Sequence, residues 1–99
     1  MDTVTLFYED HFYEATYVRA FCRDNELFVT ETISEKAPGE RYHLSLCFDE
    51  VNTGKLARRL FTSPDRLLKR LKTLFSGRNG FSSFRRFCDL TGVKYSMHA

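Results

Sequence analysis

The apolar residues in the first half of the chain recur at a period of two. Alternation of apolar and polar side chains is typical of strands with one buried face. In the last such segment, every second residue from Tyr42 to Phe48 is apolar. In the first, the same rule places Val4, Leu6 and Tyr8 on one face. The pattern predicts four strands, over residues 3–8, 12–22, 27–33 and 41–48.

Turn-forming residues separate these strands by short links. Asp24 and Asn25 lie in the polar segment 23–26, and both residue types tolerate the dihedral angles of turns. Pro38-Gly39 marks a loop before the fourth strand. Short links favour antiparallel pairing, because parallel strands need long crossover connections. We therefore expect the strands to form an antiparallel meander.

After Phe48 the apolar period changes to that of helices. The polar segment 49–53 reads as a junction, followed by a short helix over 55–61. Ser63-Pro64-Asp65 is a typical helix start, because Ser caps free amides, Pro suits the first turn and Asp meets the positive end of the dipole. That second helix runs to Phe75, and a third ends at Gly92.

The predicted fold is α+β, with one domain over residues 1–99. Residues 1–48 form a four-stranded antiparallel meander, and residues 53–91 form two or three helices packed on one face of it. A short C-terminal edge strand is expected at 93–97, where apolar residues alternate again.

The composition supports folding of a reduced, cytoplasmic protein. Ten Phe and five Tyr in 99 residues supply enough apolar surface for one core. Cys22, Cys47 and Cys88 are odd in number and far apart, which is unlike a disulfide framework. The N-terminus lacks the basic and apolar segments of a signal peptide. No apolar run reaches the ~18 residues of a membrane span, so we expect no membrane contact.

The charges divide sharply between the two halves of the chain. Residues 1–54 hold four Lys and Arg against eleven Asp and Glu, a balance of −7. Residues 55–99 hold eleven against two, a balance of +9, so the net charge of +2 conceals a dipolar chain. Such asymmetry points toward nucleic acid or an acidic partner.

Helical spacing gathers part of the positive charge on one stripe. Residues 66, 69, 70 and 73 share a face of the second helix, opposite its leucines, and no acid lies among them. Arginines in the flanking segments extend the imbalance. The predicted binding residues are Arg58, Arg59, Arg66, Lys69, Arg70, Arg78, Arg85 and Arg86.

Three interpretations of this basic surface remain open. The charges could be solvated or paired with the acidic sheet. They could contact the phosphate backbone of a nucleic acid, which gives steep salt dependence. They could also dock on an acidic protein, as in an inhibitor or immunity-type factor acting on a nucleic-acid-processing enzyme. We expect the second, with the third as the alternative.

No catalytic, metal-binding or cofactor-binding residues are predicted. His11, His43 and His98 are dispersed and lack zinc-ligand spacing from a cysteine. His43 and Cys47 are four residues apart on a strand, about 13 Å along its axis, which is too far for a nucleophile–base pair. The glycines form no phosphate loop. We therefore expect a non-enzymatic domain without a cofactor, and a small enzyme is only the third interpretation.

Aromatic residues on both faces of segment 12–22 indicate that the second face of the sheet is not purely polar. This could mark a homodimer face, a surface for another partner, or scattered exposure. Strand aromatics can also stack on single-stranded bases, although a period of two is more typical of a core.

Overall fold

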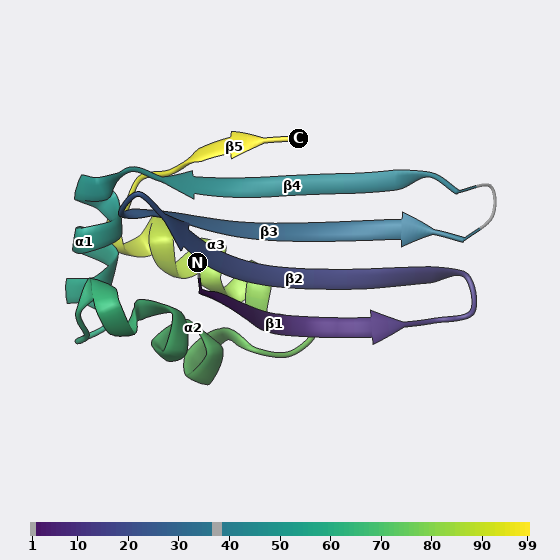
Figure 1. Cartoon of the computed structure of the whole chain (residues 1–99), viewed down its shortest axis with the longest axis horizontal. Helices are drawn as coiled ribbons and strands as arrows, with labels where there is room; N and C mark the ends of the chain where they lie inside the picture. The colour runs from purple at the N-terminus through teal and green to yellow at the C-terminus, as the bar shows by residue number, and fades with distance from the viewer. Residues whose placement is uncertain (1, 37–38) are drawn as a thin grey trace.

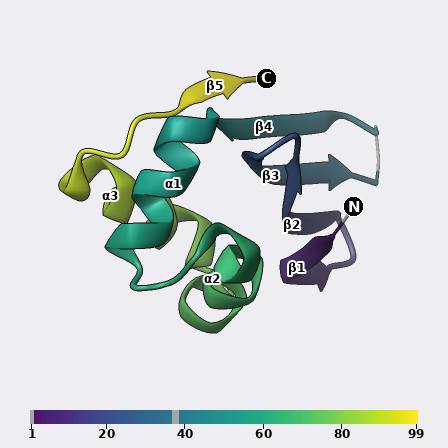
Figure 2. The same ribbon diagram turned by 60° about the vertical axis from the view of Figure 1, so that its left-hand side comes forward.

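The structure, a computed structural model, describes residues 2–36 and 39–99. These residues form an antiparallel sheet of five strands in the order β1-β2-β3-β4-β5, with three α-helices and a 3₁₀ turn on one side of it (Figures 1 and 2). The predicted α+β meander is confirmed. The strands are β1 (Thr3–Asp10), β2 (Glu14–Arg23), β3 (Glu26–Glu35), β4 (Arg41–Phe48) and β5 (Ser96–His98). The helical elements are α1 (Glu50–Arg59), the 3₁₀ turn η1 (Pro64–Arg66), α2 (Leu67–Phe75) and α3 (Gly80–Thr91).

The turn between β2 and β3 has two residues in the left-handed conformation. Asp24 has φ of 53° and Asn25 has φ of 65°. Two successive positive φ angles define the type I′ hairpin turn, whose twist matches that of the flanking strands. Asp and Asn are the non-glycine residues that best tolerate this region, which explains the predicted turn at 23–26.

The first helix begins at Glu50, five residues earlier than the sequence pattern predicts. The Asp49 carboxylate accepts hydrogen bonds from the backbone N–H of Asn52 at 2.8 Å and from its side-chain amide at 3.0 Å. These bonds lower the pKa of Asp49. The polar segment taken as a junction is therefore a capped first turn.

Two other boundaries also differ from the prediction. Ser63 makes no capping side-chain hydrogen bond, and Pro64 opens a 3₁₀ turn before α2 begins at Leu67. The last strand begins at Ser96 rather than at Val93. Val93 is instead buried in the core after Gly92, whose φ of 73° ends α3.

A register shift in β1 reverses the faces of Phe7 and Tyr8, the two aromatic residues that follow it. The pairing with β2 shifts between Thr5 and Phe7, so Leu6 occupies a bulge and is buried. Beyond the bulge, Tyr8 pairs with Tyr17 and points away from the helices. The expected common face of Val4, Leu6 and Tyr8 is therefore wrong for Tyr8.

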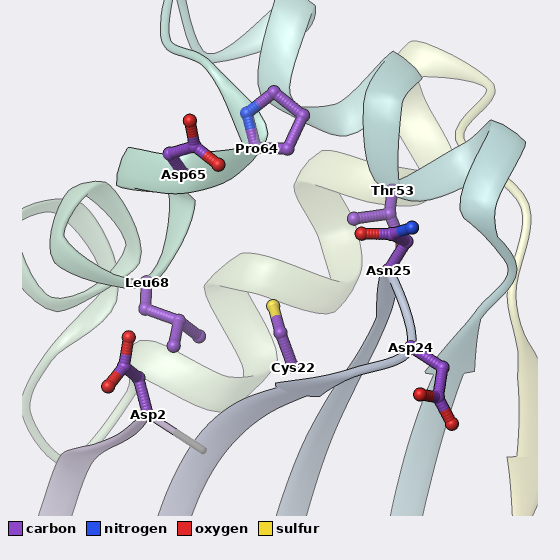
Figure 3. Close-up of a pocket in the computed structure, with 8 residues that line it drawn as sticks. All are labelled: Asp2, Cys22, Asp24, Asn25, Thr53, Pro64, Asp65 and Leu68. Carbon is purple, nitrogen blue, oxygen red and sulfur yellow. The ribbon is translucent and has the colours of Figure 1, made fainter.

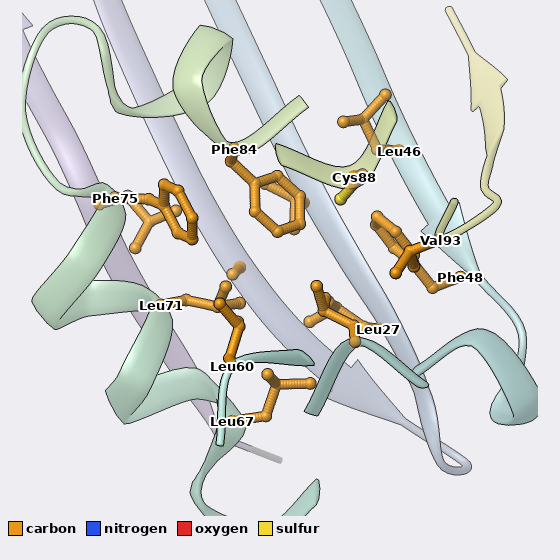
Figure 4. Packing of buried hydrophobic residues seen from close by; sticks show 14 of the residues in the cluster. Leu27, Leu46, Phe48, Leu60, Leu67, Leu71, Phe75, Phe84, Cys88 and Val93 are labelled. Atoms are coloured by element: carbon orange, nitrogen blue, oxygen red, sulfur yellow. The ribbon is translucent and has the colours of Figure 1, made fainter. Parts of the chain in front are cut away.

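The core lies between the sheet and the helices and is rich in aromatic rings (Figure 4). Phe84 packs edge-to-face against Phe48 and Phe75, with ring centroids 5.7 and 5.3 Å apart. Such pairs contribute about 0.5–1.5 kcal/mol each beyond the area they bury. Because Phe48 ends β4, Phe75 ends α2 and Phe84 lies within α3, this cluster fixes both helices on the sheet.

The strands continue beyond the helices at the end of the sheet opposite α1 (Figure 1). Phe12 and Tyr13 at this end are 84% and 77% exposed. No helix in the described part of the chain is long and apolar enough to cross a membrane.

Thr53 joins α1 to the sheet through a buried hydroxyl. Its Oγ1 donates to the carbonyl of Phe48 at 3.2 Å and accepts from the N–H of Leu27 at 3.1 Å. The Thr53→Val variant keeps the shape but leaves both backbone groups without this partner. We expect its free energy of unfolding, measured in urea, to fall by about 2 kcal/mol. Thr53→Ser keeps the hydroxyl, so an equal loss in that control would contradict this explanation.

Candidate functional site

A groove lined by three cationic and two hydroxyl side chains lies along α2 and the loop before it. The groove has a volume of about 590 Å³ and is lined by Thr62, Arg66, Lys69, Arg70 and Thr73. Four of these residues are those that helical spacing places on one stripe. Thr62 comes from the loop and has no signal in the helical pattern.

The amphipathic character of α2 fixes the direction of the groove residues. Leu67, Leu71 and Phe75 are buried on the opposite side of the helix, so the cationic side must face water. Arg70 is anchored further, because its Nε donates to the carbonyl of Leu60 at 3.0 Å. It is half-buried, whereas the sequence pattern places it on a fully solvated face.

The cations of the groove have no carboxylate partner among the described residues. The salt bridges that these residues form are His11–Glu9, Lys36–Asp10 and Arg78–Glu9, and none of them involves a side chain of the groove. Three like charges without a counter-ion repel one another, and an anion placed between them relieves this repulsion. The groove therefore suits a phosphate or another anionic group.

Comparisons of the chain with protein-family models, curated proteins and solved structures found no match. The geometry of the chain's own residues carries the functional argument.

Arg58 and Arg59 do not line the groove. They are exposed in the last turn of α1, where positive charge interacts favourably with the helix dipole. The chain then turns through Phe61 into Thr62, which lines the groove. Both arginines therefore precede the groove along the chain but are not part of its lining.

Arg78 and Arg85 are engaged in contacts within the fold and do not line the groove. Arg78 donates to the Glu9 carboxylate of β1 at 2.6 Å, which is a pairing between the two halves of the chain. Arg85 donates to the Tyr95 hydroxyl at 3.4 Å and contacts the Met97 sulfur at 3.1 Å. The hydrogen bond with Tyr95 raises the pKa of Arg85. These contacts direct both arginines toward other parts of the fold rather than toward the groove.

Arg86 is exposed on α3 and lines a different depression, of about 380 Å³. Glu31 and Asp89 also line it, so acids and bases are mixed there. Burial raises the pKa of Glu31. This mixed charge makes the depression a poorer anion site than the groove along α2.

An acidic pocket that the sequence pattern did not reveal lies on the other side of η1 (Figure 3). Asp2, Asp24 and Asp65 line it together with the Cys22 thiol, around a volume of about 440 Å³. These three aspartates are far apart in the sequence, and only the fold brings them to the same pocket. Adjacent residues of η1 divide the charge, because Asp65 lines this pocket and Arg66 lines the basic groove.

The fold raises the pKa of all three cysteine thiols. Burial, with a smaller effect of the Asp2 carboxylate, raises the pKa of Cys22. Burial also raises the pKa of Cys47, and that of Cys88 to about 12. A protonated thiol is a weak nucleophile and a weak metal ligand. No group of three or more His, Cys, Asp or Glu side chains in the described segments could hold a metal ion.

Two arginine side chains on the open face of the sheet, Arg19 and Arg23, lie against aromatic rings. The Arg19 guanidinium lies 5.9 Å from the ring centroid of Tyr17 and 5.5 Å from that of Phe21. Arg23 lies 5.8 Å from the ring of Phe28, and the rings of Phe21 and Phe28 stack at 5.0 Å. These cation–π contacts shield part of the face with its own side chains.

Proposed function

We propose that this chain is a non-enzymatic nucleic-acid-binding domain, whose basic groove along α2 holds phosphates of the backbone. The observation that carries the proposal is the convergence of Arg66, Lys69 and Arg70 on one groove, with no acidic partner within residues 2–36 and 39–99. Thr62 and Thr73 add hydroxyl donors, which commonly bind phosphate oxygens. The groove provides charge and hydrogen bonds but no set of side chains arranged to read base edges.

Each phosphate neutralised by a cation releases condensed counter-ions. Three such contacts give a slope of log K against log salt of about −2 for a single strand and about −3 for a duplex. Fluorescence anisotropy titrations of labelled oligonucleotides at several salt concentrations measure this slope. Absence of binding at low salt, or binding that salt does not weaken, would contradict the proposal.

An intracellular location is part of this proposal. The three cysteines are free, and nucleic acid is an intracellular ligand. Free thiols fit the reducing cytoplasm.

The exposed aromatic residues at the far end of the sheet favour a second candidate, a protein partner. Phe12, Tyr13 and Tyr42 are each at least half exposed, and Phe12 packs edge-to-face on Tyr13. Exposed aromatic groups of this kind are enriched in protein interfaces. In this alternative the chain is an inhibitor or immunity-type factor. Failure to bind any nucleic acid at low salt, together with co-purification of an acidic protein, would favour it.

A further inference from the structure

Phe61 is a bulky residue held in the left-handed backbone conformation. It follows the end of α1 and has φ of 57°. Its N–H donates to the carbonyl of Arg58 at 3.1 Å, and the next N–H, of Thr62, donates to the carbonyl of Ala57 at 2.9 Å. This pair of bonds is the Schellman ending of a helix, in which the left-handed position is usually glycine.

The side chain of Phe61 contributes little to the stability of the fold. It is 91% exposed, so it gains almost nothing from burial. A side chain in the left-handed region also clashes with its own backbone, and this strain is unfavourable for a bulky residue. Strained residues of this kind cluster at ligand sites, where binding compensates for the strain.

The residues before and after Phe61 each contribute to the basic groove. Thr62 lines the groove, and the Leu60 carbonyl accepts the hydrogen bond that anchors Arg70. Phe61 therefore lies next to the groove along the chain, and its ring, which is 91% exposed, projects into water. A cationic groove beside an exposed aromatic ring is the combination by which proteins bind single-stranded nucleic acid, with phosphates on the charges and a base stacked on the ring.

We propose that Phe61 stacks on an unpaired base of a strand whose phosphates lie in the groove. The preferred ligand is then single-stranded nucleic acid, because the bases of a duplex are already stacked and their extrusion is unfavourable. This inference rests on the proposed function and specifies the ligand class of the same groove.

The Phe61→Gly variant separates a role in binding from a role in folding. Glycine relieves the backbone strain, so the Tm should rise by roughly 2–5 °C. Loss of the ring should weaken binding of a base-bearing single strand about 10-fold, since stacking on an aromatic ring has effects of this size. An abasic strand of the same length offers phosphates without bases, and its affinity should not change. Phe61→Tyr keeps both a ring and the strain, so it is the matched control with unchanged affinity.

Fluorescence anisotropy with both strands, and with a duplex of the same sequence, tests the inference. Unchanged affinity of Phe61→Gly for the base-bearing strand would overturn it, as would an equal loss for the abasic strand or a preference of the wild type for the duplex. Groove-dependent binding that persists in these cases would leave the proposed function standing. A wild-type chain that binds none of the probes would overturn both and direct attention to a protein partner.

Discussion

Replacement of Gly80 by alanine should lower the free energy of unfolding by about 3 kcal/mol or more. A Cβ atom at this position would lie 1.8 Å from the carbonyl oxygen of Phe75 and 2.6 Å from its carbonyl carbon. Both are backbone atoms, so no side-chain rotation relieves the overlap. The start of α3 or the end of α2 must move. At an ordinary helix position, replacing glycine by alanine raises the free energy of unfolding by about 0.5–1 kcal/mol. At Gly80 we expect the opposite change.

Gly54→Ala is the matched control, because Gly54 also lies in a helix. A Cβ atom there meets only the Arg58 guanidinium, at 3.7 Å, which is an ordinary contact. We expect Gly54→Ala to raise the free energy of unfolding by about 0.5–1 kcal/mol. Urea denaturation of both variants gives the comparison. A neutral or stabilising effect of Gly80→Ala would show that α2 and α3 do not approach each other as described.

The close approach of Gly80 to the Phe75 backbone also helps to fix the orientation of α2, which carries the groove. The loop between the helices is fixed at both ends, since the Gly77 N–H donates to the Leu6 carbonyl at 3.0 Å and the Gly80 N–H donates to the Gly77 carbonyl at 3.1 Å. Phe75, at the end of α2, packs on Phe84. The cationic side of α2 is therefore held in one direction by the core beneath it.

The features that the sequence predicted well are those set by local geometry. The strand over 41–48 has the same bounds in the structure, because its alternation is regular and unbroken. Asp24 and Asn25 form a turn because their side chains tolerate positive φ. The bulge at Leu6 was not predicted, since an extra residue in one strand is visible only against its partner strand.

In the candidate site, too, the sequence predicted the part that depends on local geometry. The stripe of Arg66, Lys69 and Arg70 follows from helical spacing alone and recurs in the groove. The contacts of Arg78 with Glu9 in β1 and of Arg85 with Met97 in β5 join different elements of the fold, so no helical pattern reveals them. Phe61 was expected inside the helix over 55–61, because an apolar residue at the end of a helical pattern carries no mark of a left-handed conformation.

Reversal of two charges in the groove is the substitution with the largest expected effect on binding. Arg66→Glu with Lys69→Glu should weaken nucleic-acid binding about 100-fold at low salt, since two charged contacts of about 1.5 kcal/mol each are lost. Arg70 is left in place because its bond to the Leu60 carbonyl supports the fold. Both substituted side chains are exposed, so the free energy of unfolding should change by no more than about 0.5 kcal/mol.

The control for that double variant is Arg41→Glu with Lys94→Glu. These side chains are exposed, lie outside the helices, and give the same change in net charge. If the field of the whole chain governed binding, both double variants would lose affinity equally. If the groove holds the phosphates, only Arg66→Glu with Lys69→Glu loses affinity. Its slope of log K against log salt on a single strand then becomes shallower, changing from about −2 to between about −1 and 0. Equal losses in the two double variants would therefore contradict a localised site, because a general electrostatic attraction does not distinguish which cations are reversed.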